Sequence, residues 1–388
     1  MPAFAVRPEV QQLQPKLVEW RRHLHACPEL GLETRATAAY VTGLLASFGY
    51  QPQAVLQTGV VALIEGQPGG PVLAVRADMD ALPIQEANDV PYRSRIDGVM
   101  HACGHDGHTA IALGAAAYLA QHRDAFAGSV KFLFQPGEEG PGGAKPMIEA
   151  GVLAAPTVER IIGLHIASGM PSGWVAVHDG PSSTGLDEFT IAVHGPGGHS
   201  SSPHHTVDTV AVAAEIITAL QAIPARLIDP QEEVAVVVCT LQGASARNVI
   251  PATVTLGGTV RYLDPAVGKL VQAKMQQLVA GICAAYGATY DLDYQTTYPA
   301  VVNDPAVTAI VRQVVTEVVG AERMLNMGMR ASDDMGFFLQ AVPGAYFYLG
   351  GGHPEGPNHT PRFDFDEAVL ELGVELLVRC VEALCRRT

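Results

Sequence analysis

The feature that most constrains the fold of this chain is a set of short apolar runs that each lead directly into polar residues with metal-binding side chains. Runs of this length, bounded by turn residues, are typical of buried strands. The carboxyl ends of parallel strands meet at one edge of a sheet, where ligands collect. The sequence therefore predicts one site at the edge of a mainly parallel sheet, built from three such junctions: 72–77 into Asp78 and Asp80, 129–134 into Glu138 and Glu139, and 160–164 into His165.

Segments with helical periodicity alternate with these strands. Helices are expected over 9–26, 33–48 and 109–121, and the pattern returns after residue 304 with a helix, a strand at 345–349 and a C-terminal helix from 365. Strands that alternate with helices indicate an α/β fold in which helices cover both faces of the sheet.

The middle of the chain has a different pattern. Its expected order is β-α-β-β-α-β, which is the signature of a ferredoxin-like module. We therefore predict an inserted α+β domain at 187–298 and a catalytic domain formed by 1–186 and 299–388. Two domains are the usual outcome for a chain of 388 residues. The expected elements of the inserted domain are strands at 188–194, 234–241, 254–262 and 289–297, and helices at 207–223 and 266–286.

The composition of the chain argues against some classes of partner and indicates the cellular compartment. The net charge of −15 argues against nucleic acid or an anionic membrane as a partner, because both select basic surfaces. The six cysteines are widely spaced without a CxxC pair, so a disulfide framework is not expected. Residues 1–18 lack the apolar core of a secretory signal, and no apolar run is long enough for a bilayer. We expect a cytoplasmic protein without a nucleic-acid or membrane partner.

Four polar loops carry the candidate metal ligands. Cys103 and His105 are two residues apart, a spacing that places both side chains on one face of an extended segment. His165 follows a strand, and His359 lies between two prolines that restrict its backbone. Thiolate, imidazole and carboxylate together suit Zn²⁺, Mn²⁺, Co²⁺ or a similar ion. Each residue alone also fits a structural role, so the combination carries the prediction.

The adjacent pair Glu138-Glu139 is the sharper signal. Neighbouring carboxylates repel each other unless a cation or a proton lies between them. We assign Glu139 as a ligand and Glu138 as the general base that takes a proton from water and returns it to the leaving nitrogen. The alternative is a solvated acidic turn. Asp80 is expected to orient a ligating histidine through its second ring nitrogen, and Asp106 is expected to be a local capping residue.

Other chemistries find little support in the sequence. The glycine-rich segment 195–200 does not match a dinucleotide fingerprint, and 137–145 does not match a P-loop. A serine nucleophile elbow is absent from the sequence. A covalent mechanism that uses Cys103 with His105 as its base stays open.

Seven motifs in order along nearly the whole chain resemble one family. The chain is similar to the aminoacylase/carboxypeptidase-type dinuclear metallohydrolases, and within them to the amidohydrolase branch. That branch includes hippurate hydrolases, N-acyl-L-amino-acid amidohydrolases and auxin-conjugate hydrolases. The motifs lie at 21–31, 76–83, 100–108, 135–140, 195–205, 248–251 and His359.

The resemblance implies a ligand set and a cofactor. It implies two divalent ions per chain, drawn from Mn²⁺, Zn²⁺, Co²⁺ and Ni²⁺, with Glu138 as the base. Sister branches usually have a bridging Asp at the position of Cys103, so the resemblance leaves open whether this thiolate bridges both ions. The implied ligands are Cys103, His105, Glu139, His165 and His359.

The resemblance also assigns roles to the inserted domain, which would act as a lid and carry the contact of a homodimer or higher homo-oligomer. In this family the histidine that matches His199 polarises the scissile carbonyl, often across the dimer. Asn248 and Arg261 match lid residues that hold the substrate, and a guanidinium suits a free α-carboxylate. One departure is Asp333, which stands where relatives often have Glu, one methylene longer.

These observations together predict a metal-dependent amidohydrolase. It would cleave the amide bond of an N-acyl or N-aroyl amino acid, giving a carboxylate and a free amino acid. Alternatives are a dipeptidase or carboxypeptidase on the same scaffold, a non-catalytic metal- or ligand-binding protein, and a hydrolase with Cys103 as nucleophile. A chelator distinguishes the hydrolase with Cys103 as nucleophile from a metal enzyme, because only the metal enzyme loses activity when the metal is removed.

Overall fold

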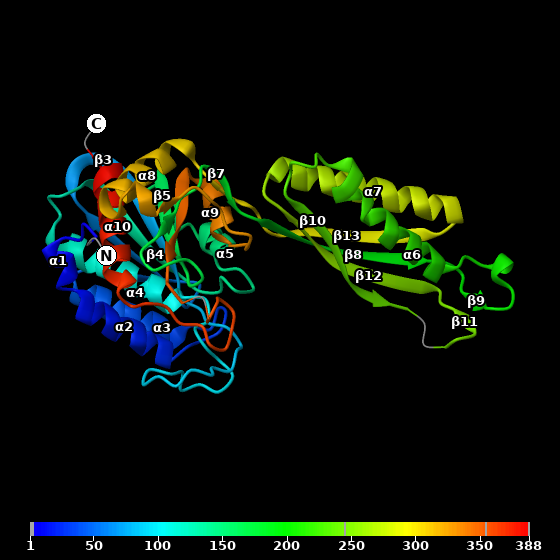
Figure 1. The fold of residues 1–388 in the computed structure, drawn as a ribbon, viewed down its shortest axis with the longest axis horizontal. Coiled ribbons are helices and arrows are strands. Elements are labelled where there is room, and N and C mark those ends of the chain that lie inside the picture. Colours follow the sequence, from blue (N-terminus) through cyan, green and yellow to red (C-terminus); the bar gives the residue numbers. More distant parts are fainter. Residues whose placement is uncertain (1–3, 244–245, 354, 387–388) are drawn as a thin grey trace. The chain divides into compact units, whose positions relative to one another are not determined.

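The computed structural model describes residues 4–243, 246–353 and 355–386. The chain forms two compact units, and it enters the second of them twice (Figure 1). Unit 1 comprises Met1–Ser182, Val302–Gly328 and Phe337–Thr388, and unit 2 comprises Ser183–Val301 and Met329–Gly336. The sequence places the inserted domain at 187–298, without the second, short segment.

An eight-stranded sheet organises unit 1. Its order is β1-β2-β4-β3-β5-β16-β6-β15. The central strands β4, β3, β5 and β16 run parallel, whereas β1, β2 and β6 join by antiparallel pairing. The prediction of a mixed α/β fold with a mainly parallel sheet is confirmed. The strands are β1 Gln53–Val55, β2 Gly59–Glu65, β3 Gln67–Asp78, β4 Ala127–Gln135, β5 Arg160–Ala167, β6 Val175–Ala176, β15 Met324–Leu325 and β16 Gly344–Gly350, and β7 Gly180–Ser183 pairs separately with β14 Val301–Asn303.

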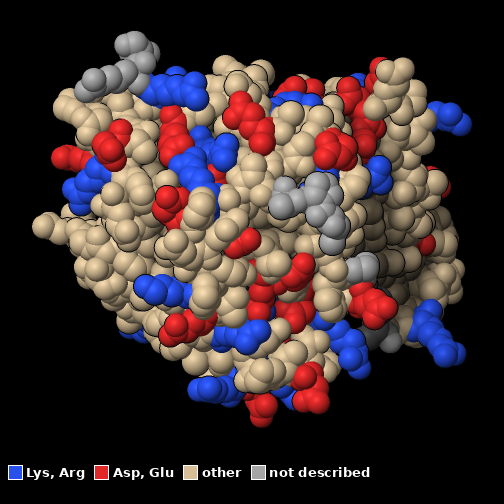
Figure 2. All heavy atoms as spheres, turned by 60° about the vertical axis from the view of Figure 1, so that its left-hand side comes forward, with Lys and Arg blue, Asp and Glu red and all other residues tan. Residues whose placement is uncertain are grey.

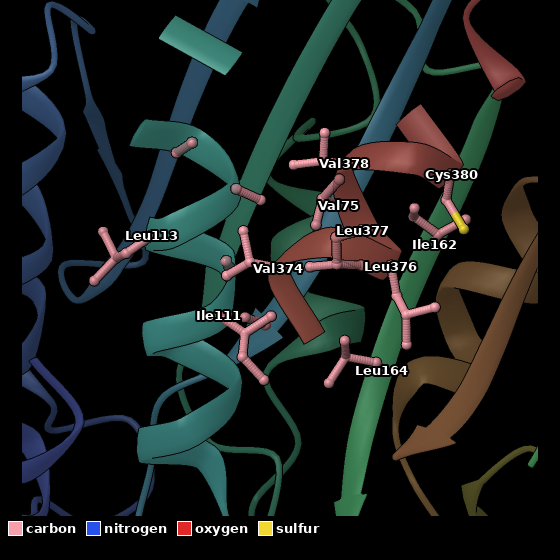
Figure 3. Close-up of a cluster of buried hydrophobic side chains, with 14 of the residues drawn as sticks. Val75, Ile111, Leu113, Ile162, Leu164, Val374, Leu376, Leu377, Val378 and Cys380 are labelled. Atoms are coloured by element: carbon pink, nitrogen blue, oxygen red, sulfur yellow. The ribbon is translucent and has the colours of Figure 1, made fainter. Parts of the chain in front are cut away.

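Helix α4 forms the centre of the unit 1 core. It is rich in Ala and mostly apolar on all sides beyond its polar first turn, and its residues 105–119 are all buried. Close packing requires glycine at Gly114, where a Cβ would lie 2.5 Å from Val374 Cγ2. Figure 3 shows Ile111 of α4 beside Val374 of α10 (Val369–Leu384), in a cluster that also contains side chains of β3 and β5. This packing fixes the position of His105, the first residue of α4 (His105–Gln121).

The other helices of this part of the chain have ordinary sequence signals. Asp304 caps α8 by accepting hydrogen bonds from the backbone N–H groups of Ala306 and Val307, and a proline follows it at the first helical position. The remaining helices are α1 Pro8–Gln11, α2 Gln14–Ala26, α3 Arg35–Ser47, α5 Ala144–Glu149, α8 Pro305–Val319 and α9 Met335–Ala341, with a 3₁₀ turn at Ala321–Arg323.

Unit 2 has the predicted β-α-β-β-α-β order. Its antiparallel sheet has the order β10-β12-β8-β13, and side chains of β8 alternate between buried and more exposed positions. Two helices pack on the buried face of this sheet (Figure 1). A separate two-stranded pair, β9 with β11, lies beyond it. The elements are β8 Gly185–His194, β9 Gly198–His199, α6 Thr209–Leu220, β10 Val234–Gln242, β11 Val249–Ile250, β12 Thr253–Tyr262, α7 Pro265–Tyr286 and β13 Thr289–Tyr298, with a 3₁₀ turn at Pro203–His205 and a π turn at Ile223–Leu227.

Two surface properties bear on possible partners. Among the described residues, no helix combines the length and the apolar character needed to cross a membrane. On the face shown in Figure 2, Lys and Arg side chains are interspersed with Asp and Glu side chains rather than gathered in one patch.

Candidate metal centre

The edge of the unit 1 sheet brings the predicted ligand loops together. Asp78 ends β3, the loop with Glu138 and Glu139 follows β4, and His165 lies near the end of β5, which continues two residues past it. Because these three strands are parallel neighbours, their carboxyl ends meet at one edge. The first turn of α4 adds His105 to this edge.

Cys103 occupies one side of the cluster. Its Sγ lies 3.4 Å from His165 Nε2 and 3.3 Å from His359 Nε2. His165 Nδ1 lies 2.8 Å from the carbonyl oxygen of Ile166. Because a carbonyl only accepts, Nδ1 carries the hydrogen in the neutral ring and Nε2 presents a lone pair toward the sulfur. The pKa of His165 is lowered, first by burial and then by the neighbouring His108, so the ring favours this neutral, ligating form.

His105 and the glutamate pair form the other side. His105 Nε2 lies 3.8 Å from Glu138 Oε2 and 4.0 Å from Glu139 Oε1, and Glu139 Oε1 lies 3.1 Å from His359 Nε2. Cys103, Glu139 and His359 form one group whose ligand atoms all lie within 4.8 Å of one another, and Cys103, His105 and His165 form a second. The five predicted ligands therefore lie in one cluster.

Divalent cations fit this donor set. Among the described residues, His105 Nε2 is buried without a hydrogen-bond partner. Burial and the nearby Glu139 carboxylate raise the pKa of the Cys103 thiol, so a thiolate there needs a cation to balance its charge. Burial alone would lower the pKa of His105, but the Asp78 carboxylate and the Asp80 contact outweigh it and raise that pKa. The same negative surroundings attract a metal ion.

Asp80 connects three parts of the cluster. Its carboxylate accepts hydrogen bonds from the backbone N–H groups of Glu138, at 2.9 Å, and Glu139, at 3.0 Å. Its backbone carbonyl accepts from His105 Nδ1 at 2.8 Å, and its carboxylate oxygen Oδ1 lies 3.4 Å from the same nitrogen. Asp80 therefore contacts Nδ1 of the candidate ligand His105, with its carbonyl closer than its carboxylate.

Unit 2 holds two of its three predicted residues together. His199 in β9 is opposite Val249 in β11, and the N–H of Ser200 donates to the Asn248 carbonyl at 3.1 Å. His199 Nδ1 accepts from the N–H of Ser201 at 3.1 Å. In the neutral ring the hydrogen is therefore on Nε2, which makes His199 a hydrogen-bond donor.

Arg261 lies in β12 of the four-stranded sheet, at the end of that strand away from the β9–β11 pair. It is eight residues along β12 from Thr253, the residue nearest to the β9–β11 pair, a separation of roughly 26 Å at about 3.3 Å per residue. Arg261 lines a cavity of about 410 Å³ together with Arg330 and Glu233, which form an ion pair at 3.2 Å. Its Nη1 donates to Ser332 Oγ.

Comparison with known proteins identifies the family. Residues 74–383 match Peptidase family M20/M25/M40. The chain belongs to this family. It is similar to Thermostable carboxypeptidase 2 of Saccharolobus solfataricus, with 39% identity and 94% of each chain covered. It is also 42% identical to an N-acyl-L-amino acid amidohydrolase of Geobacillus stearothermophilus, over 76% of this chain and 80% of the relative.

A solved structure extends the likeness to the whole fold. The YXEP protein of Bacillus subtilis, described as a dinuclear metal binding peptidase of the M20 family, is 31% identical with a TM-score of 0.86. The match covers 97% of this M20 chain and 100% of that one. The suspected resemblance to this group of hydrolases is confirmed.

The expectation that Asp106 caps a helix is wrong. Its Oδ1 has no hydrogen-bond partner among the described residues, so this oxygen caps no backbone N–H of α4. Asp106 is fully buried, and its Oδ2 lies 2.8 Å from both Arg21 Nε and His25 Nδ1. The first turn of α4 faces α2 in this M20 fold, so the carboxylate pairs with a buried cation instead of the helix N–H groups.

Sequence reasoning missed His108. Its Nδ1 lies 2.6 Å from Asp78 Oδ1, and its Nε2 accepts the N–H of Ile166 at 2.7 Å. Asp78 also pairs with Arg76 at 2.7 Å. The signal was present, because His108 follows His105 by three residues and so lies on the same face of an otherwise apolar helix.

Proposed function

We propose that this M20 protein is a metal-dependent amidohydrolase that cleaves N-acyl or N-aroyl amino acids into a carboxylate and a free amino acid. One observation carries the proposal: Glu138, a buried carboxylate, lies beside a cluster that already contains five other metal-ligand side chains. A protein that only binds metal has no need of a base beside its ligands. The N-acyl-L-amino acid amidohydrolase among the relatives supports the substrate class.

Two divalent ions would be held by the cluster. We assign Cys103, His105, Glu139, His165 and His359 as their ligands, and Mn²⁺, Zn²⁺, Co²⁺ and Ni²⁺ as the candidate ions. When bound, such ions supply Lewis-acid chemistry, which polarises an amide carbonyl and acidifies water. The description of the YXEP protein as a dinuclear metal binding peptidase supports two ions rather than one.

Glu138 would carry the proton. It takes a proton from the attacking water as the oxygen bonds to the acyl carbon. It then delivers that proton to the amide nitrogen as the carbon–nitrogen bond breaks, so the amino acid leaves as a neutral amine. The hydrogen bond from its N–H to Asp80 fixes its backbone for this role. The His359 side chain is 54% exposed, so substrate would approach the cluster from that side.

Residues of unit 2 would bind the substrate. His199 has its ring hydrogen on Nε2, the form that donates to a carbonyl oxygen as negative charge develops on it. Asn248, next to it, would contribute an amide. Arg261 would bind the α-carboxylate of the amino acid through its guanidinium fork.

The separation within unit 2 supports a homodimer. Arg261 is separated by most of the length of β12 from the end of that strand that leads to the β9–β11 pair, where His199 lies, and this is farther than a small N-acyl amino acid extends. We therefore propose that His199 of one chain serves the site of a second chain. The edge strand β10 is a suitable contact, because in the described part of the chain it pairs with a strand on one side only, and Val237 and Leu241 are 49% and 60% exposed. The molar mass in solution of the wild type and of Val237→Lys tests this contact: the wild type should be a dimer, and the variant should dissociate.

Amino-acid release tests the proposal. The wild type, Glu138→Gln and the control Glu33→Gln, whose carboxylate is exposed, are given N-acetyl and N-benzoyl amino acids with Mn²⁺ or Zn²⁺, and with a chelator. Removing a general base lowers the rate about 10²- to 10⁴-fold, so Glu138→Gln should lose that much and the control nothing. Activity that survives strong chelation favours Cys103 as a nucleophile. Two bound ions without turnover favour a binding protein.

A carboxypeptidase is the second candidate. The Saccharolobus solfataricus relative with that name is 39% identical over nearly the whole chain. Both activities need an amide next to a free α-carboxylate, and they differ in whether the acyl part is a simple acid or a peptide. Matched dipeptides with a free amine belong in the same assay. Release from dipeptides alone moves the assignment to a peptidase.

A further inference from the structure

The side chain of Asn358 lies between three of the loops that carry candidate ligands. Its Nδ2 donates to the carbonyl oxygen of Cys103 at 3.0 Å and to that of Ile166 at 3.3 Å. Its Oδ1 accepts from Ser168 twice, from the N–H at 3.2 Å and from Oγ at 3.0 Å. Both ends of the amide are therefore used, and each bond leads to a different loop from the one that contains Asn358.

Every donor contact of Asn358 is at or beside a ligand. Cys103 is itself a ligand, and Nδ2 also lies 3.8 Å from its Sγ. The Ile166 carbonyl is the same group that accepts from His165 Nδ1 and so orients that ring. The next residue in the chain is His359. One amide thus contacts the segments of three of the five ligands.

The backbone of His359 needs such an anchor. Its φ is +67°, in the left-handed region that is unfavourable for a residue with a Cβ. This conformation persists only where the surroundings hold it. The N–H of His359 donates to the Ala102 carbonyl at 2.7 Å, and Asn358 holds the residue before it. Together these bonds point the His359 ring toward Cys103 and Glu139.

We propose that Asn358 is a positioning residue that sets the placement of Cys103, His165 and His359 relative to one another, and so sets the affinity of the centre for metal. This inference rests on the proposed metal-dependent function. Asn358 touches no substrate in this role, and it acts through the ligands. Replacing residues that orient ligands typically costs 10- to 100-fold in metal affinity.

Three substitutions test the donor and the acceptor end of the Asn358 amide independently. Asn358→Asp keeps an acceptor for Ser168 but replaces the donor with a carboxylate oxygen that faces two carbonyls and a thiolate. Asn358→Ala removes both ends. Ser168→Ala removes only the contact from its hydroxyl. The control is Asn88→Ala, because Asn88 donates to Phe363 in the same loop at 2.8 Å but contacts none of the ligand-bearing residues.

Co²⁺ is the probe, because a thiolate ligand to Co²⁺ gives a charge-transfer absorption that reports on Cys103 directly. Calorimetric titration of Co²⁺ into the metal-free protein should give dissociation constants about 10- to 100-fold above wild type for Asn358→Asp and Asn358→Ala. The charge-transfer band should weaken in both. Ser168→Ala and Asn88→Ala should stay within about threefold. At saturating Co²⁺, kcat should fall in the two Asn358 variants while KM stays near wild type.

Two outcomes overturn different claims. If wild type binds two Co²⁺ ions and Asn358→Asp matches it in affinity and band intensity, Asn358 is not a positioning residue and the proposed function stands. If wild type itself binds no metal, the proposed function fails and this inference falls with it. Thermal unfolding of each variant checks the fold. Should Asn358→Asp not fold, the uncharged Asn358→Ala and Asn358→Gln decide the question by the same two readouts.

Discussion

The candidate residues of unit 1 and those of unit 2 are held in opposite ways. In unit 1, His105 and Glu138 are 0% and 6% exposed, and hydrogen bonds from other elements fix their backbones or rings. In unit 2, His199 in β9 and Asn248 just before β11 are exposed, and Arg261 lies in the separate four-stranded sheet. The candidate metal centre is thus built into the core of its unit, whereas unit 2 offers single residues on a surface. Substitutions should therefore couple stability to function in unit 1 and separate them in unit 2.

The buried charges explain why unit 1 is organised in this way. Arg21 is fully buried in α2 and pairs with Asp106 beside the first turn of α4, at 2.8 Å. It also pairs with Asp364, at 2.8 Å, and Glu367, at 3.2 Å, both in the segment that follows His359. Its guanidinium lies over the Phe365 ring, 4.3 Å from the centroid. A single cation therefore links the segments of two candidate ligands.

The largest effect on this comparison should come from Arg21→Met. The change removes one partner from three carboxylates, and breaking a buried ion pair in this way typically costs about 3–5 kcal/mol. Urea unfolding should show that loss, and metal affinity should fall with it. Arg35→Met is the control, because its pair with Glu33 is exposed and such pairs contribute about 0–1 kcal/mol. Equal losses in the two variants would mean that the buried network does not hold unit 1 together.

His199→Ala should show the opposite behaviour. We expect kcat/KM on an N-acyl amino acid to fall about 10²- to 10³-fold, the usual loss when a donor to a developing oxyanion is removed. The melting temperature should stay at its wild-type value, because the ring is exposed and its partner Ser201 lies in the same turn. His205→Ala, in the same exposed loop, is the control for activity. A large loss of stability in His199→Ala would contradict the contrast between the units.

Asp187→Ala tests whether unit 2 has a polar core of its own. Asp187 is buried, and its two carboxylate oxygens accept from the hydroxyls of Tyr262, at 3.0 Å, and Tyr294, at 2.7 Å. Leaving the buried Tyr262 hydroxyl and the half-buried Tyr294 hydroxyl without this acceptor should cost about 1–3 kcal/mol in urea unfolding. The dissociation constant for metal should not change, because this cluster belongs to unit 2. Asp293→Ala, on the exposed side of β13, is the matched control, and a shift in metal affinity for Asp187→Ala alone would contradict the separation.

The long elements, and the clustering of the candidate ligands, could be predicted from the sequence because both depend on local pattern. The run at 129–134 became β4, Ala127–Gln135, and the βαββαβ order of unit 2 follows its alternating and helical periods. Residues that follow parallel strands must meet at one sheet edge, so the closeness of Glu139 and His165 to one site could be expected without a structure, and their role as ligands stays a prediction. Helix α4 starts four residues before the expected 109, since burial of its first turn outweighs the loop-like composition of His105 and Gly107.

Roles that depend on distant contacts were not predictable. Asn358 and Cys103 are 255 residues apart in the chain, and Arg21 and Asp364 are 343 apart. Nothing in the local pattern at either position indicates its partner. The segment Met329–Gly336 belongs to unit 2 for a similar reason, as its Ala331 carbonyl accepts from the N–H of Thr184. Strands of two or three residues, such as β6 and β15, have no period to detect.

The smallest expected effect is a pH dependence of stability that distinguishes the paired carboxylate of Asp364 from an exposed carboxylate. Burial alone would raise the pKa of Asp364, but Arg21, the N–H of Phe365 and the Tyr92 hydroxyl hold that pKa below its usual value. A lowered pKa in the folded state stabilises the protein above the unfolded value of about 3.9, and this contribution disappears as the pH falls through the folded pKa. Unfolding free energies of wild type and Asp364→Asn should therefore differ most near neutral pH and converge below about pH 4. The difference should be about 1 kcal/mol, because the Asp364 side chain is 15% exposed and its pairing is partly screened. Asp97→Asn, at an exposed position, should show no such pH-dependent gap, and a constant gap across pH for Asp364→Asn would mean that the residue acts through packing instead of charge.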